Sequence, residues 1–158
     1  MILETPAQRR ALLASVKTVA IVGASDKPQR ASFFVARYLR NHGYTVWPVN
    51  PAYALIDGEP AFKTLGDLVK AHGIPDVVDV FRRPDSLGPL VEEAIALKVR
   101  AIWFQYGVVN PDAIKRAAEA GLTVVADRCM KVEHARFTGG LSMAGLNSGL
   151  VSSKRSPL

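Results

Sequence analysis

The sequence predicts an α/β protein with a doubly wound parallel sheet of about five strands and helices on both faces. Five short apolar segments, typical of strands buried on both faces, alternate with segments whose apolar residues recur at helical spacing. Glycine, asparagine or proline stands where most of these segments should end. Since crossovers between parallel strands are right-handed, this alternation places helices on both sides of one sheet.

The elements follow in a regular order along the chain. Strands are expected over residues 18–22, 44–49, 76–81, 100–104 and 122–126. Helices are expected over residues 7–14, about 31–42, 65–72, 85–97 and 111–120, with 127–136 partly helical. An irregular loop is expected over residues 50–60. A single domain would then occupy residues 1–137, and residues 138–158, where the composition shifts to Gly and Ser, would form a flexible C-terminal tail.

Composition and charge narrow the classes of partner. The formal net charge of +6 over 158 residues favours an anionic partner. The basic residues form no strip interleaved with aromatic residues, so nucleic acid is not expected. No apolar run approaches the ~20 residues of a membrane span, and the first residues do not resemble a signal peptide. The lone cysteine suits a cytoplasmic protein, and a homo-oligomer is compatible with the sequence.

The loop after the first strand is the strongest candidate for a binding element. The apolar run 18–22 ends at Gly23, and a loop with Lys27 and Arg30 leads into a helix. A strand, a turn of small residues and a helix together point backbone N–H groups and the positive end of the helix dipole at an anion. An ordinary strand-to-helix connection is the alternative reading.

Ligands of such folds lie at the carboxyl ends of the strands, so the residues that follow each strand are the next candidates. These residues are rich in arginine, amides and small side chains, which favours an anionic, hydrogen-bonding ligand. They are Gly23, Ala24, Ser25, Lys27, Arg30, Asn50, Pro51, Phe81, Arg82, Arg83, Gln105, Tyr106, Gly107, Asp127, Arg128 and Cys129.

The same positions argue against NAD as the ligand. The dinucleotide fingerprint needs three glycines after the first strand, but Gly23 is followed by alanine and serine. It also needs an acid after the second strand, where this chain has Asn50 and Pro51. A neutral residue tolerates an extra phosphate, so an NADP-linked oxidoreductase remains the alternative.

No catalytic residue or metal site is assigned. Cys129 lies beside Arg128 and near Lys131 and His134, which would suit a reactive thiol, but a lone cysteine is more often a small buried apolar residue. One cysteine and three scattered histidines provide no closed zinc site.

Taken in order, the motifs resemble those of the small stand-alone CoA-binding proteins, which are similar to the N-terminal CoA-binding domain of the succinyl-CoA synthetase α subunit. The resemblance covers roughly residues 10–137. It rests on residues 23–30, 49–51, 80–83, 103–107 and 127–134.

The resemblance implies a Rossmann-like fold that holds coenzyme A at the strand ends. The loop from Gly23 to Ser32 would bind the phosphates, and Asn50 and Pro51 would lie against the nucleotide. The path of the nucleotide and pantetheine would follow Phe81, Arg82 and Arg83, with Gln105, Tyr106 and Gly107 towards the thiol. Such a protein would bind CoA or acyl-CoA without catalysis, because this chain lacks room for the synthetase's phosphohistidine domain. Cys129 could form a mixed disulfide with the CoA thiol.

Overall fold

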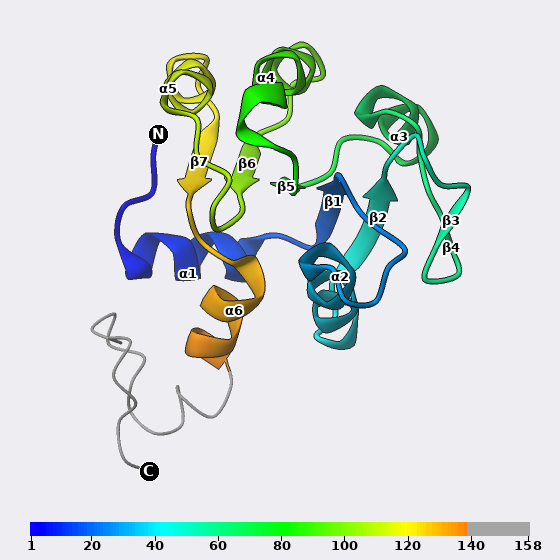
Figure 1. Ribbon diagram of the computed structural model, residues 1–158. Helices are drawn as coiled ribbons and strands as arrows, with labels where there is room; N and C mark the ends of the chain where they lie inside the picture. Colours follow the sequence, from blue (N-terminus) through cyan, green and yellow to red (C-terminus); the bar gives the residue numbers. More distant parts are fainter. Residues whose placement is uncertain (139–158) are drawn as a thin grey trace.

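A computed structural model describes residues 1–138, and the expected tail beyond Thr138 lies outside the described residues. The main sheet has the order β2-β1-β5-β6-β7, and every pairing in it is parallel (Figure 1). Its strands are β1 (Thr18–Val22), β2 (Thr45–Val49), β5 (Val77–Val80), β6 (Ala101–Phe104) and β7 (Thr123–Ala126). The helices are α1 (Pro6–Ser15), α2 (Ala31–Asn41), α3 (Leu65–His72), α4 (Leu87–Ala96), α5 (Pro111–Glu119) and α6 (Met130–Thr138). The predicted fold class is confirmed.

Two local predictions need correction. The loop expected to be irregular over 50–60 contains a small antiparallel hairpin of β3 (Leu55–Ile56) and β4 (Glu59–Pro60). Its two-residue turn places Asp57 and Gly58 at positive φ, 50° and 76°, which matches the twist of paired strands. The helix expected to begin near residue 85 starts instead as a 3₁₀ turn, η1 (Pro84–Ser86), before α4. Elsewhere the boundaries differ by a few residues.

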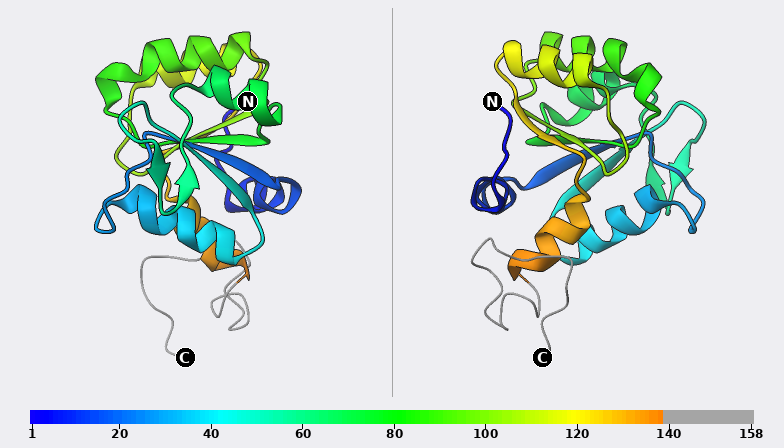
Figure 2. Two further views of the ribbon diagram at one scale, coloured as in Figure 1. Left: turned by 90° about the vertical axis from the view of Figure 1, so that its right-hand side faces the viewer. Right: turned by 60° about the vertical axis from the view of Figure 1, so that its left-hand side comes forward.

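The sheet separates two apolar clusters, each covered by its own helices (Figure 2). Residues of α3, α4 and α5, such as Leu68, Leu87 and Ala117, pack on one face. Residues of α1, α2 and α6, such as Leu13, Leu39 and Met130, pack on the other. This arrangement explains why the strands read as continuous apolar runs, since both faces of the sheet are buried.

The order of the strands fixes where a ligand can bind. The chain passes from β1 to β2 on one side and then returns to β5 on the other side of β1. Helices that connect these strands therefore diverge at β1, and a crevice opens at the carboxyl ends of β1 and β5. The β1–α2 loop and the residues after β5 lie at this reversal of strand order.

Candidate functional site

A cavity of about 380 Å³ opens at the carboxyl ends of β1, β2 and β5. We call it the carboxyl-end cavity. Its lining comes from the β1–α2 loop, the first turn of α2, the residues after β2 and the residue after β5. The lining residues are Gly23, Ser25, Lys27, Arg30, Ala31, Ser32, Asn50, Tyr53 and Phe81. Strand ends far apart in the sequence thus meet in one polar cavity with two cationic side chains.

Gly23 is the turn on which this cavity depends. Its φ is +85°, and its amide donates a hydrogen bond to the Val49 carbonyl at 2.9 Å. A Cβ atom at this position would lie 2.4 Å from the carbonyl oxygen of Phe81. Only glycine therefore lets the loop cross this closely over the end of β5.

The loop that follows is held by its own serines. The Ser25 amide donates to Oγ of Ser32 at 3.0 Å, and the Lys27 amide donates to Oγ of Ser25 at 3.1 Å. Ser32 is buried, which fixes the loop against the start of α2. The Tyr53 hydroxyl lies 3.5 Å from Oγ of Ser25 and closes the other wall. These contacts tie the loop to the start of α2 and to the residues after β2.

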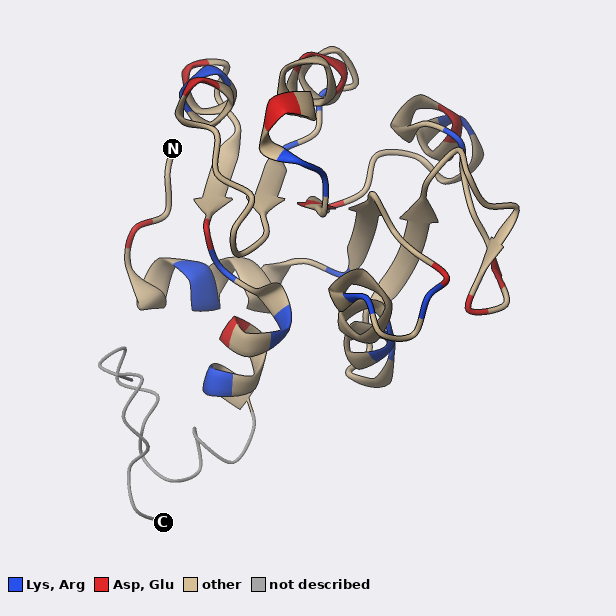
Figure 3. Ribbon diagram, in the orientation of Figure 1, with Lys and Arg blue, Asp and Glu red and all other residues tan. Residues whose placement is uncertain are grey.

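The start of α2 is electropositive and has no side-chain cap. Thr5, Thr64 and Asn110 cap α1, α3 and α5 by accepting a hydrogen bond from the backbone. At α2 the capping position is Arg30, which makes no such bond, and the first turn holds no acidic residue. The N–H groups of that turn are thus left without a side-chain acceptor, which favours an anion. Figure 3 shows basic residues on this loop and on the turn after β5.

Asn50 holds the neighbouring turn. Its Nδ2 donates to the Ala24 carbonyl at 2.8 Å, and its Oδ1 accepts from the Ala52 amide at 2.9 Å. The amide group therefore joins the ends of β1 and β2. Ala24 itself is buried and lies behind the cavity wall, and Pro51 is exposed beside it.

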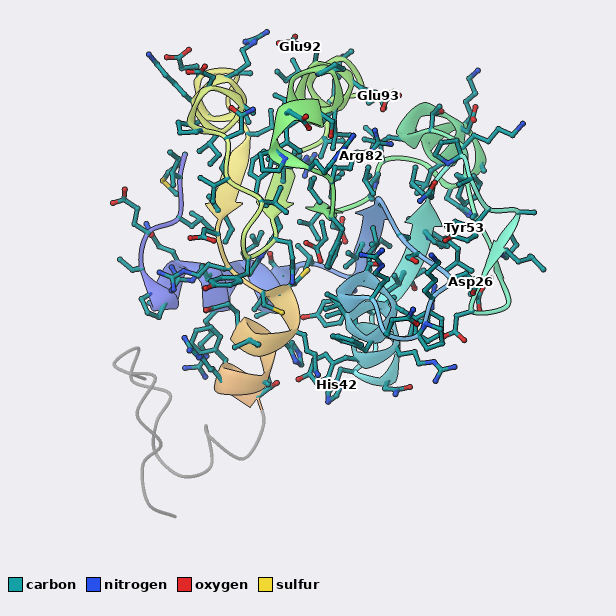
Figure 4. The ribbon with its side chains drawn as sticks, in the orientation of Figure 1. Asp26, His42, Tyr53, Arg82, Glu92 and Glu93 are labelled. Atoms are coloured by element: carbon teal, nitrogen blue, oxygen red, sulfur yellow. The ribbon has the colours of Figure 1, made fainter. Side chains whose placement is uncertain are left out.

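The hairpin clamps the outer edge of the loop. Oδ1 of Asp26 accepts from the Asp57 amide at 2.8 Å, and Arg37 pairs with Asp57 through two bonds of 2.7 and 2.8 Å. The Arg37 guanidinium lowers the pKa of Asp57 by hydrogen bonding. Asp26 and Tyr53 lie on this side of the molecule in Figure 4. One acid of the loop is thus turned to the hairpin.

The remaining predicted residues do not line the cavity. Arg82 is partly exposed, and its Cγ would lie 3.2 Å from a Cβ at Gly23, so its stem runs along the rim. Arg83 is 87% exposed and lies 3.9 Å from Asp85. Gln105 is buried and accepts a 3.4 Å bond from the Met130 amide.

Beyond the rim, the β6–α5 loop lies open to solvent. Tyr106 is 75% exposed, and the Gly107 amide donates to Oδ1 of Asp127 at 2.9 Å. These residues could contact only the part of a long ligand that leaves the cavity.

Sequence reasoning missed Tyr53, whereas Ala31 lies within the predicted phosphate-binding loop from Gly23 to Ser32. Tyr53 follows the second strand by four residues, and its amide bonds to the Asn50 carbonyl at 3.4 Å. An aromatic residue shortly after an Asn-Pro turn is the signal that could have found it. Ala31 contributes because it stands in the first turn of α2.

Cys129 and His134 belong to a different part of the fold. Cys129 is partly buried against the apolar cluster of α1, α2 and α6. Nδ1 of His134 lies 2.9 Å from the Tyr38 hydroxyl. Within residues 1–138 no cluster of His, Cys, Asp and Glu could hold a metal ion. No helix in that range is long and apolar enough to cross a membrane.

Comparison with known proteins places the chain in a family. A model of the CoA binding domain matches residues 17–135. The uncharacterized protein YneT of Bacillus subtilis is 37% identical over 129 residues, which are 82% of this chain and 93% of YneT. A hypothetical protein of Pyrococcus horikoshii OT3 is 40% identical with a TM-score of 0.80, covering 86% of this chain and 94% of its own.

A Thermus thermophilus structure, cell-free ID.343, is 41% identical with a TM-score of 0.78, over 84% of this chain and 98% of its own. These relatives match nearly their whole length, so the shared unit is the entire small domain. The family match spans the cavity and every strand that surrounds it. The chain belongs to the CoA binding domain family.

Proposed function

We propose that this protein binds CoA or an acyl-CoA, with the phosphates and nucleotide in the carboxyl-end cavity, and performs no chemistry of its own. The observation that carries this proposal is the first turn of α2. This turn has no side-chain cap, and with Lys27 and Arg30 it lines a cavity at the reversal of strand order in a chain of the CoA binding domain family. Phosphate groups are the ligands that such helix starts favour.

The cavity is sized for part of the ligand. About 380 Å³ suits a nucleotide fragment better than a whole CoA molecule with its long arm. The arm would leave past Phe81 and run over the rim at Arg82 towards the exposed β6–α5 loop. This path uses the predicted residues that do not line the cavity. It also gives Tyr106, which is highly exposed, a ligand to contact.

The competing proposal is an NADP-linked oxidoreductase. The observation behind it is the neutral Asn50 at the end of β2, which would tolerate a ribose phosphate. Both groups of the Asn50 side chain are already bonded to Ala24 and Ala52. Each of these groups keeps one further hydrogen-bonding position, so Asn50 does not separate the two ligands, and the family match is what favours CoA.

Calorimetry on the purified full chain tests the proposal with three ligands. CoA should bind saturably. Dephospho-CoA should bind at least about tenfold more weakly, because it lacks the 3′-phosphate and the contacts that this group makes. NADP should not saturate at the same concentrations. Binding of NADP without CoA would make the oxidoreductase the leading function, and binding of neither would reject both.

A further inference from the structure

Asp79 is a buried acid in the centre of the main sheet. It lies in β5, and its residue is fully inaccessible to solvent. Neither carboxyl oxygen has a hydrogen-bond partner among the described residues. It is the one residue in the described part of the chain with buried side-chain atoms left in this state. Buried polar groups are nearly always paired, so an unpaired one needs an explanation.

The register places this acid beneath the carboxyl-end cavity. Asp79 lies opposite Ile21 of β1 and Trp103 of β6. Side chains two residues apart on a strand share a face, so Phe81 follows Asp79 on the same face, about 7 Å further along. Phe81 is partly exposed and lines the cavity. Along that face, Phe81 is the next side chain towards the proposed ligand.

Burial also affects the protonation state of the Asp79 carboxyl group. It raises the pKa of Asp79 well above the usual range, and the nearby Val80 amide opposes this only in part. Burial without a partner therefore favours the carboxylic acid form, which can donate a hydrogen bond. An apolar side chain would fill the same strand position without the cost of an unpaired polar group. The acid thus weakens the fold unless something else uses it.

The following inference rests on the proposed function. We propose that Asp79 is a ligand-binding residue of the carboxyl-end cavity, whose neutral carboxyl group donates a hydrogen bond to a carbonyl oxygen on the arm of bound CoA or acyl-CoA. The Phe81 ring turns aside to let this contact form. The arm carries amide carbonyls, and an acyl-CoA adds a thioester carbonyl, so suitable acceptors pass over this position. The phosphates and adenosine bind beside the β1–α2 loop and do not reach Asp79.

Two ligands and two variants test this inference by calorimetry on the full chain. Adenosine 3′,5′-bisphosphate has the nucleotide and phosphates but lacks the arm. Asp79→Leu removes the donor and keeps the same branched arrangement of side-chain heavy atoms, whereas Asp79→Asn keeps an N–H donor. Asp79→Leu should weaken CoA about tenfold and leave the bisphosphate unchanged. Asp79→Asn should bind CoA within about threefold of the unmodified chain.

Thermal unfolding of the same variants separates binding from structure. Asp79→Leu should unfold at the same temperature as the unmodified chain or higher, because an unpaired polar group is gone. A marked fall for Asp79→Leu but not for Asp79→Asn would mean that the carboxyl group is bonded inside the fold, and would overturn the inference. Equal CoA affinity in both variants and the unmodified chain would overturn it too. If the unmodified chain binds neither ligand, the proposed function fails as well.

Infrared spectroscopy tests the contact between Asp79 and CoA in the complex of the unmodified chain. The protonated carboxyl band at neutral pH is assigned by its loss in Asp79→Asn. CoA should shift this band in the unmodified chain, and adenosine 3′,5′-bisphosphate should not. A band that CoA leaves unmoved contradicts the inference even if Asp79→Leu fails to fold.

Discussion

The two ends of α2 lie beside two cavities of similar size, which differ in the polarity of the helix ends around them. The carboxyl-end cavity, at the start of α2, has about 380 Å³, and a second cavity, at the end of α2, has about 390 Å³. We call the second the amino-end cavity, because it lies before β1 and β2. Its lining is also basic and includes Arg10, Lys17, His42, Gly43 and His134. Figure 4 labels His42 near this end of α2.

Helix polarity distinguishes these two cavities. The amino-end cavity is lined by the last turns of α1, the residues that directly follow α2 and the last described turn of α6. Carbonyl groups and the negative ends of helix dipoles gather there, and nearby cations offset them. Nδ1 of His42 lies 2.7 Å from the Tyr38 carbonyl, where it can donate a hydrogen bond to that group. In the carboxyl-end cavity Lys27 and Arg30 instead add to a positive helix start. A basic lining therefore indicates a phosphate site only together with the direction of the helices around it.

The largest expected difference comes from matched glycine substitutions. Gly23→Ala forces a Cβ against the Phe81 carbonyl at a positive φ, so it should lower the free energy of unfolding by about 2–4 kcal/mol. Gly43→Ala, at φ +92° with no atom within 4 Å of the added Cβ, should cost only about 1 kcal/mol. Urea unfolding measures both. Equal losses of unfolding free energy would contradict the close approach of residue 23 to the Phe81 carbonyl.

Removing a basic side chain should weaken CoA binding at the carboxyl-end cavity but not at the amino-end cavity. Lys27→Gln and Arg30→Gln should each weaken CoA binding about tenfold, and reduce its dependence on salt. The controls Arg10→Gln and Lys17→Gln change the same charge at the amino-end cavity and should leave the affinity unchanged. A loss of CoA affinity in Arg10→Gln or Lys17→Gln would place the ligand in the amino-end cavity and contradict the proposed site.

A buried hydroxyl gives a smaller effect. Ser32→Ala removes the acceptor of the Ser25 amide and should weaken CoA binding by roughly fivefold, with a stability loss of about 1 kcal/mol. Ser15→Ala is the control, since its exposed hydroxyl donates to the Leu12 carbonyl at the end of α1. Calorimetry and urea unfolding report both effects. If the two variants bind CoA equally well, the serine contact does not organise the loop.

Acid sensitivity should belong to the amino-end cavity. Burial, assisted by His42, lowers the pKa of His134 below 6.5. Its neutral form is favoured in the fold, so this stability is present above pH 6.5 and is lost as the pH falls towards the folded-state pKa. Besides His42, the ring faces Tyr38, Tyr44 and Thr138.

Unfolding midpoints from pH 7.5 to 5.5 measure this effect. The midpoint should fall over that range, and the fall should be smaller in His134→Gln. His72→Gln is the control, because that ring stacks on Trp47 at a centroid distance of 4.6 Å, away from this cavity. An unchanged pH profile in His134→Gln would assign the sensitivity to another group.

The sequence predicted the strands and the glycine turn well because both depend on local chemistry. Apolar runs identify buried strands, and Gly23 stands where such a run stops. The hairpin at Asp57 was missed because its strands have two residues each, too few to show alternation. The sequence could not show that Gln105, predicted towards the thiol end of the ligand, accepts a hydrogen bond from the Met130 amide, because that contact depends on the docking of α6. Its place at the ligand stays a prediction. Asp79 reads as one polar residue within an apolar run, and only the register places it under the cavity.

Amide hydrogen exchange with and without CoA shows which cavity holds the ligand, because it reports both cavities in one experiment. CoA should slow exchange in residues 25–33, at the β1–α2 loop and the start of α2, and leave exchange in residues 42–44 unchanged. Slower exchange at residues 42–44 with none at residues 25–33 would contradict the proposed site, since the ligand would then occupy the cavity at the negative ends of the helices.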